Sequence, residues 1–302
     1  MNDVAAPAAW SIMVLTPLFF STNLIFGRWT VPEVAPFTLA FLRWGAVALI
    51  LLPFSRGHVR TALDAGWRIP LLAFLGMWVC GAIVYLALGV TTATNATLIY
   101  TTSPVFVLLI EWYGGRRLDG LRFLGCLVAI AGVGVILFEG DATRLMGLSL
   151  NWGDLAILGC AVAWAAYSIV FREPGLGRLP APAIFGLISG AGAILLAPFA
   201  LIELLSGADM PTSIRAWAGV LGIVLCSSLI AFGGYQFGLR RFGPAVTSVF
   251  MYLLPVYGVL LATTLLGEAF RTYHAAGIAL VLGGVILATR PRKMPRMSTG
   301  RG

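Results

Sequence analysis

Charged side chains are scarce in this sequence. Asp, Glu, Lys and Arg make up 11% of its 302 residues, whereas soluble domains carry about 25%. Hydrophobic residues make up 59%, and the mean hydropathy is +0.94. These values exclude a soluble globular domain. The net charge of +8 does not indicate a nucleic-acid partner, because the basic residues lie in short connections and in the C-terminal tail rather than on one soluble face.

The groups that catalysis or metal binding would require are also few. The two histidines, His58 and His274, lie in a loop and at the end of an apolar run. The sequence has no His-Glu-x-x-His, no Gly-x-Ser-x-Gly and no P-loop. Each of the four cysteines lies in a different apolar run, which is typical of small buried residues and not of a metal site. We therefore expect no enzyme activity, no cofactor and no metal, and we disfavour an intramembrane enzyme.

Long apolar runs are what the sequence has in abundance. A run of about 20 residues spans a bilayer as a helix. The runs are continuously apolar instead of alternating, which indicates helices and not the strands of a barrel. We predict ten spans, at residues 10–29, 37–54, 69–90, 95–113, 121–138, 153–171, 182–204, 216–238, 244–266 and 273–289.

One stretch of the sequence occurs twice, at residues 94–138 and 245–288. The matched positions are Pro104 with Pro255, Gly125 with Gly277, and Gly132 with Gly284. This duplication predicts two five-helix repeats, residues 1–139 and 140–302, the second with a basic tail. An odd number of helices inverts the second repeat relative to the first, as in secondary transporters whose substrate site lies between the halves near the bilayer midplane.

The distribution of basic residues predicts the orientation. With the N-terminus in the cytoplasm, the cytoplasmic segments hold 15 of the 20 Lys and Arg residues, and the outer loops hold 4. Positive charge concentrates on the cytoplasmic side of short loops. We therefore expect both termini in the cytoplasm. The remaining basic residue is Arg43, which lies inside a span.

Several aromatic residues lie away from the membrane interfaces, where Trp and Tyr normally collect. Trp78, Tyr100, Trp164 and Tyr252 lie near the middle of their spans. Their polar atoms need partners, so these side chains should face the bundle or a wet cavity and not lipid. We predict an aromatic-lined central cavity that binds substrate. The alternative is ordinary helix packing, with the hydroxyl groups bonded to neighbouring backbone.

Polar residues extend this candidate site. Tyr167 and Ser168 share a helix face with Trp164, because they follow it by three and four positions. Asn23 lies near the middle of the first span and is a further candidate for substrate contact. Such a buried Asn can also serve only to bond another helix.

Three further residues within spans have a predicted role. Pro104 and Pro255 each remove a backbone hydrogen bond in mid-helix, so we predict that they act as hinges. Arg43 is either a counter-ion for a substrate carboxylate or a structural residue that bonds carbonyl groups or extends toward the interface. We favour the structural role.

Short motifs carry a family resemblance over nearly the whole chain. Residues 20–23 (Phe-Ser-Thr-Asn) resemble a Trp-Gly-Ser-Asn start, residues 42–44 (Leu-Arg-Trp) a Leu-Arg-Phe motif, and residues 164–167 a Trp-Ala-x-Tyr motif. Together with the duplicated stretch, they resemble the EamA-type repeat of the drug/metabolite transporter superfamily, and YddG-type bacterial amino-acid exporters most of all. Phe20 and Arg116 depart from the usual Trp and Glu.

The resemblance implies a function that the composition does not. It implies a secondary transporter that exports amino acids, aromatic ones included, and related small metabolites across the bacterial inner membrane by alternating access. A multidrug or cationic-metabolite efflux permease of the same fold is the alternative. The expected partners are a small-molecule substrate and the lipid bilayer, with no nucleic acid, and a monomer is compatible with the sequence. Because no convincing titratable group lies at the midplane, we favour gradient-driven export over proton antiport.

Overall fold

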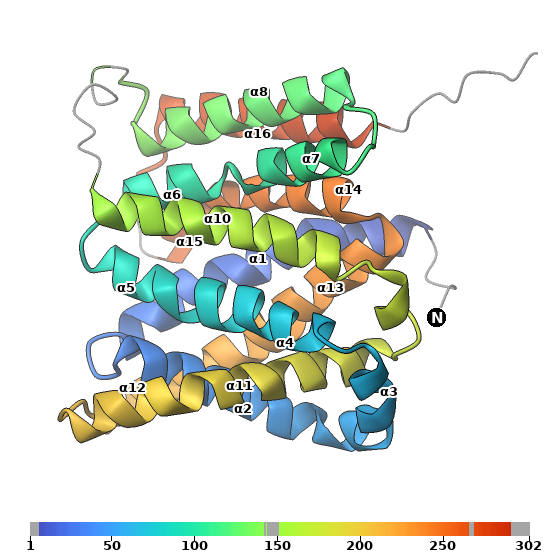
Figure 1. Cartoon of the computed structure of the whole chain (residues 1–302). Coiled ribbons are helices and arrows are strands. Elements are labelled where there is room, and N and C mark those ends of the chain that lie inside the picture. The colour runs from blue at the N-terminus through green and yellow to red at the C-terminus, as the bar shows by residue number, and fades with distance from the viewer. Residues whose placement is uncertain (1–5, 142, 144–150, 266–268, 291–302) are drawn as a thin grey trace, which may run out of the picture.

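The computed structural model describes residues 6–141, 143, 151–265 and 269–290 (Figure 1). All regular structure in these residues is helical, and ten segments are long and apolar enough to cross a membrane. They coincide with the ten predicted spans, so the all-helical membrane fold is confirmed. Arg144, the duplicated loop at 267–268 and the basic tail from 291 lie outside the described residues.

The first five spans are built as follows. Span 1 is α1 (Ala6–Thr30), span 2 is α2 (Pro36–Ser55), and span 3 joins α4 (Arg68–Ala73), η2 (Phe74–Ile83) and α5 (Val84–Leu88). Span 4 joins α6 (Ala93–Tyr100) and α7 (Ser103–Tyr113), and span 5 is α8 (Gly120–Leu137). The short helices η1 (Arg56–His58) and α3 (Val59–Asp64) connect spans 2 and 3.

The other five spans repeat this plan. Span 6 is α10 (Trp152–Val170) and span 7 is α11 (Ala181–Leu205), with η3 (Pro174–Leu176) between them. Span 8 joins α12 (Ile214–Gly222), η4 (Ile223–Ile230) and α13 (Ala231–Arg241). Span 9 joins α14 (Pro244–Val249), η5 (Phe250–Tyr252) and α15 (Leu253–Leu265), and span 10 is α16 (Thr272–Thr289).

Side-chain caps fix where several helices begin. Thr92, Asp119 and Ser213 each accept hydrogen bonds from backbone N–H groups in the first turn of the helix that follows. Asn151 and Asp154 form a reciprocal capping box at the start of α10. These caps satisfy donors that a helix start otherwise leaves without partners, which matters most near a membrane.

Spans 4 and 9 are interrupted at equivalent places. The break in span 4 falls at residues 101–102, and Pro104 lies in the first turn of α7. In span 9 a 3-10 turn, η5, precedes the start of α15, in which Pro255 lies. Proline lacks an N–H and its ring clashes with the carbonyl one turn earlier, so each helix is interrupted just before its proline. The structure thus places both predicted hinge residues beside breaks.

Spans 3 and 8 share a feature that the sequence did not reveal. Their central segments, η2 and η4, are π-helical, with wider turns than an α-helix. The two segments occupy equivalent positions in the two repeats. π-helical turns are rare and frequently mark functional sites.

The repeats meet through equivalent helices along two opposite flanks (Figure 1). α2 packs on α11 along one flank and α8 on α16 along the other. The duplicated glycines make the second contact close. A Cβ atom on Gly125 would lie 2.7 Å from the Gly284 carbonyl oxygen, and one on Gly132 would lie 2.8 Å from the Gly277 carbonyl oxygen. Small residues allow such close approach of membrane helices.

A loop glutamate from each repeat also braces the two halves. Glu33, after span 1, accepts hydrogen bonds from Thr212 and Ser213 at the start of span 8. Glu173, after span 6, pairs with Arg68 at the start of span 3. The two braces lie on opposite ends of the bundle and occupy equivalent places in the repeats.

Candidate functional site

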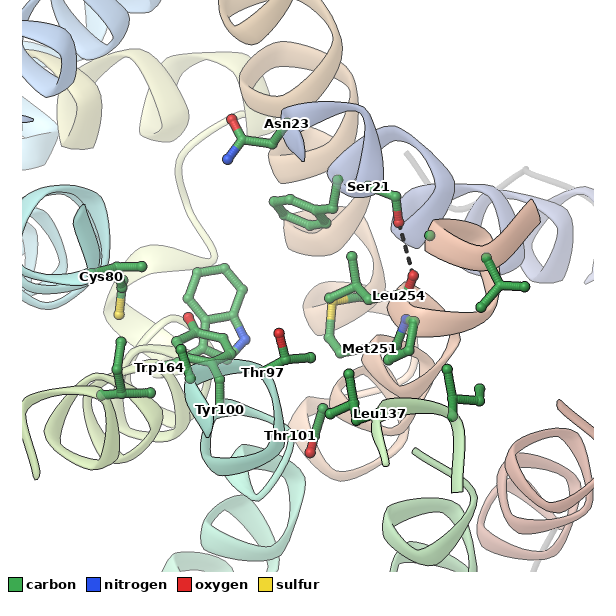
Figure 2. A pocket seen from close by; sticks show the side chains of 18 of the residues that line it. Ser21, Asn23, Cys80, Thr97, Tyr100, Thr101, Leu137, Trp164, Met251 and Leu254 are labelled. Carbon is green, nitrogen blue, oxygen red and sulfur yellow. Dashed lines mark hydrogen bonds between the residues drawn. The ribbon is translucent and has the colours of Figure 1, made fainter. Parts of the chain in front are cut away.

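A cavity of about 520 Å³ lies in the centre of the bundle, between the repeats (Figure 2). Helices of both repeats line it, namely α1, α2, α6 and α8 from the first and α10, α13, α15 and α16 from the second, together with η2, α5 and η5. The lining is mainly apolar and aromatic. Its rings belong to Phe20, Trp44, Tyr100, Trp164 and Phe232.

Trp164 is the centre of the aromatic wall. Its ring centroid lies 5.2 Å from that of Phe232 and 6.2 Å from that of Phe20, both in edge-to-face geometry. The Tyr100 ring is 6.5 Å away in a tilted arrangement. Edge-to-face contacts are favoured by the ring quadrupoles and hold the rings in fixed directions. The wall is therefore a preformed surface for a planar or apolar side chain. Tyr100 and Trp164 line the cavity, and their contact with substrate stays a prediction.

Tyr167 and Ser168 lie below the cavity and not in it. Both are completely buried. The Tyr167 ring stacks on Trp164 at 5.6 Å, and its hydroxyl accepts a hydrogen bond from Gln236 Nε2 at 2.8 Å. The Ser168 hydroxyl is 2.7 Å from the Tyr235 hydroxyl. These side chains form a closed floor that supports Trp164 from beneath.

Polar groups enter the cavity from α1. Asn23 lines it, with Nδ2 3.5 Å from the Tyr85 hydroxyl, and its Oδ1 has no hydrogen-bond partner among the described residues (Figure 2). Ser21, two residues earlier, bonds the Leu254 carbonyl at 3.1 Å and so ties α1 to the start of α15. Asn23 therefore adds an amide to the nearly apolar lining, and the Oδ1 atom of this amide is enclosed without a hydrogen-bond partner among the described residues.

Arg43 also lines the cavity, which corrects our expectation of a carbonyl-bonded or outward-reaching side chain. It is buried, with 7% of its surface exposed. Its Nε donates to Ser228 Oγ in η4 at 2.6 Å, and its guanidinium lies 4.5 Å above the Trp44 ring centroid. The π-helix explains the position of Ser228, which bonds the carbonyl of Ile223, five residues earlier. Its position inside a span had marked Arg43 in the sequence as a possible counter-ion, the role that we did not favour.

Trp78 and Tyr252 do not line the cavity. Trp78 packs in a separate cluster with Phe37, Phe74 and Phe199, at centroid distances of 6.2, 5.3 and 5.5 Å. Cys80, which our sequence reasoning treated as inert, lines the cavity two residues later. Tyr252 is fully buried in η5, while the neighbouring Met251 faces the cavity (Figure 2). Phe20, Trp44 and Phe232 were also not selected from the sequence.

The hinge residues differ in their relation to the cavity. Pro255 is part of its lining, whereas Pro104 is buried one turn beyond the lining residues Thr97, Tyr100 and Thr101. The break in span 4 thus separates the cavity-lining helix α6 from α7.

In the part of the chain that the structure describes, the cavity lining extends toward one end of the bundle. Its lining includes Leu137 at the end of α8, Thr263 near the end of α15 and His274 at the start of α16. The opposite end is filled by the floor of Tyr167, Tyr235 and neighbouring side chains. The pocket lining therefore extends to the C-terminal ends of α8 and α15 and to the start of α16.

Comparison with known proteins finds relatives that are similar to this chain over most of its length. A transporter of Archaeoglobus fulgidus is 26% identical over 92% of this chain and 96% of its own length. The inner membrane transporter YedA of Escherichia coli K12 is 27% identical over 91% of both chains. The aromatic amino acid exporter YddG of Ancylobacter novellus is 24% identical over 92% of this chain and 96% of its own. A solved crystal structure, 24% identical, shares the fold with a TM-score of 0.76 over 94% of this chain and 96% of its own.

Both halves of the sequence match one family. The EamA-like transporter family matches residues 8–138 and again residues 151–290. These matches cover most of the chain and agree with the resemblance seen in its motifs. With ten apolar helices, the protein is a multi-pass membrane protein, and it belongs to the EamA-like transporter family.

Proposed function

We propose that this protein is a secondary transporter that exports amino acids, aromatic ones included, and related small metabolites by alternating access. The observation that carries the proposal is the central cavity of about 520 Å³ with its wall of aromatic rings around Trp164. Small-molecule sites have volumes of roughly 300–1,000 Å³ and combine apolar walls with a few polar groups. The Oδ1 atom of Asn23 is enclosed and unpaired, and a rotation of this amide toward the cavity would let it accept a hydrogen bond from the substrate amino group.

The relatives support this proposal at the level of substrate and membrane. One is named an aromatic amino acid exporter and another an inner membrane transporter. We therefore place this protein in the bacterial inner membrane and include aromatic amino acids among its substrates. We propose no enzyme activity, and we propose that export follows the substrate gradient, because the described residues that line the cavity include no Asp or Glu.

The direction of opening identifies the state of the alternating-access cycle that the structure represents. If both termini are cytoplasmic, as the basic residues predict, the loops after α8 and before α16 are outside. The cavity would then be open to the outside and closed toward the cytoplasm by the floor beneath Trp164. Loading from the cytoplasm requires that this floor open while the outer mouth closes. The breaks at Pro104 and Pro255 are where we expect the helices to bend.

A permease for cationic drugs or metabolites is the second candidate. Aromatic faces bind cations, so the wall alone would suit such a substrate. The guanidinium of Arg43 in the same cavity would repel a cation, which favours amino acids.

The test is uptake of a panel of radiolabelled amino acids into proteoliposomes that contain the purified protein. We expect saturable uptake of several amino acids, and a loss of roughly tenfold in Trp164→Ala from lost stacking and burial. Trp112→Ala is the matched control, because Trp112 is exposed on α7 outside the cavity. Equal uptake in the absence and presence of a proton gradient would support gradient-driven export.

Two outcomes would contradict the proposal. If correctly inserted protein takes up no amino acid, the substrate assignment is wrong, and cationic compounds become the next panel. If Trp164→Ala transports as well as Trp112→Ala, the cavity is not the substrate site.

A further inference from the structure

Arg43 is a positive charge in the interior of a membrane protein. It lies in the first half of α2, is 7% exposed, and contributes to the lining of the central cavity. Charged residues within spans are costly, and they are normally paired or in contact with a water-filled space. The charge of Arg43 therefore requires a partner in or beside the cavity.

No protein carboxylate neutralises Arg43 in the part of the chain that the structure describes. The ion pairs found there join Arg68 to Glu173 and Arg116 to Glu111, far from the cavity. The nearest partners of Arg43 are neutral, namely the Ser228 hydroxyl and the phenol groups of Tyr85 and Tyr100. Polar neutral neighbours solvate a guanidinium but leave its charge uncompensated.

Arg43 has more donors than its protein partners use. Nε donates to the Ser228 hydroxyl, and the guanidinium also interacts with the Tyr85 hydroxyl. A guanidinium carries five N–H donors, so several remain. Because Arg43 is part of the cavity lining, a substrate in the cavity can reach this side chain. A guanidinium edge with two adjacent N–H groups matches the two oxygens of a carboxylate.

The duplicated helix shows that the fold does not need this cation. Aligning Pro36 with Pro182, at the starts of α2 and α11, places Ser189 opposite Arg43. Ser189 is completely buried in α11, the helix that packs against α2. A structural requirement of the repeat would apply to both copies. The arginine is found in one copy, and in that copy it borders the cavity.

We infer that Arg43 binds the carboxylate of the transported molecule and so restricts transport to substrates that carry one. This inference rests on the proposed function, because it assigns a chemical group of the substrate to the same cavity. A series of ring contacts connects Arg43 to the aromatic wall. The Arg43 guanidinium covers Trp44, whose ring is 5.1 Å from Phe232, which in turn is 5.2 Å from Trp164. A substrate with its carboxylate at Arg43 would direct its side chain toward Trp164.

The test compares an acid with its neutral amide. Inhibition of radiolabelled L-phenylalanine uptake into proteoliposomes is measured with unlabelled L-phenylalanine and with L-phenylalaninamide, in the wild type and in Arg43→Gln. We expect the wild type to prefer the acid by roughly 10- to 100-fold, the range for hydrogen bonds to charged groups. Arg43→Gln should bring the two compounds to similar half-inhibiting concentrations. Arg43→Lys keeps the charge but loses the paired donors, so its preference for the acid should lie between those of the wild type and Arg43→Gln.

The control is Arg122→Gln, which removes the same group at the end of α8, where Arg122 Nε bonds the Ala288 carbonyl. Its preference for the acid should match the wild type. The inference is overturned if the wild type accepts acid and amide equally. It is also overturned if Arg43→Gln lowers uptake but keeps the preference, because that is the result of a structural role. The wild-type comparison stands even if Arg43→Gln does not fold, and uptake of no amino acid at all would instead refute the proposed function.

Discussion

The contact between α8 and α16 offers a direct test of how the repeats are held together. A Cβ atom on Gly284 would lie 2.5 Å from the backbone nitrogen of Ala129 and 2.6 Å from the carbonyl oxygen of Gly125. Both are backbone atoms, so Gly284→Ala forces the helices apart. The adjacent Gly283 has no atom within 4 Å of a built Cβ. Gly283→Ala is therefore a matched control with the same gain in helix propensity.

The difference between these variants isolates the steric effect. Overpacking of this kind costs about 1–3 kcal/mol, while the propensity gain of about 1 kcal/mol applies to both variants and cancels. We expect Gly284→Ala to unfold at a free energy about 1–3 kcal/mol below that of Gly283→Ala. In α8, Gly132→Ala should lose stability in the same way, because its Cβ would lie 2.7 Å from the Val281 nitrogen.

The assay is equilibrium unfolding by sodium dodecyl sulfate in mixed micelles, followed by circular dichroism. The reasoning is refuted if Gly284→Ala and Gly283→Ala have free energies of unfolding within about 0.5 kcal/mol of each other, the usual spread of harmless substitutions.

Two further predictions concern the brace at Glu33 and the breaks in spans 4 and 9. Hydrogen bonds from the Ser213 side chain and from nearby backbone N–H groups lower the pKa of Glu33 to about 2 from 4.5. The stabilisation from the ionised Glu33 is present above pH 4.5 and is lost as the pH falls toward 2. The difference in melting temperature between wild type and Glu33→Gln should therefore shrink over that window. A constant difference would show that the brace contributes nothing through its charge. Pro104→Ala and Pro255→Ala each restore a backbone N–H and favour a continuous helix. We therefore expect both variants to take up substrate more slowly in proteoliposomes while still binding it. Normal rates in both variants would show that neither residue is a hinge.

Much of the fold could be predicted because its signals are local. Continuous apolar runs gave all ten spans, and the duplicated stretch gave two repeats. The four glycines of that duplication proved to lie in one helix contact, but crosswise, because Gly125 approaches Gly284 and Gly132 approaches Gly277. The sequence indicated that these positions are equivalent, but not that they meet, because contact depends on how the repeats dock.

The site was predicted less well, because helical periodicity gives the direction of a side chain and not its depth. Trp164, Tyr167 and Ser168 do share a face of α10, yet Trp164 borders the cavity while the other two lie in the floor. Which turn of a helix meets the cavity depends on its neighbours. In span 3 the predicted direction of the Trp78 side chain was wrong as well. The π-helical turns of η2 set the side chains at a different angular spacing, so that Cys80 and not Trp78 faces the cavity.

The irregular parts of the bundle are concentrated where the substrate would bind. The π-helical segment η2 and the breaks of spans 4 and 9 contribute residues to the cavity lining, and η4 contacts the lining residue Arg43 through Ser228. The flanking pairs α2–α11 and α8–α16 are continuous helices in close contact. Within a membrane, irregular backbone is tolerated only where protein or a wet cavity satisfies its polar groups. The same elements carry the chemistry, since η4 supplies Ser228 to Arg43 and α15 begins at the carbonyl that Ser21 bonds. Binding a carboxylate at Arg43 would therefore act directly on η4, one of the irregular segments. That connection gives substrate binding a physical route to the helices that we expect to move.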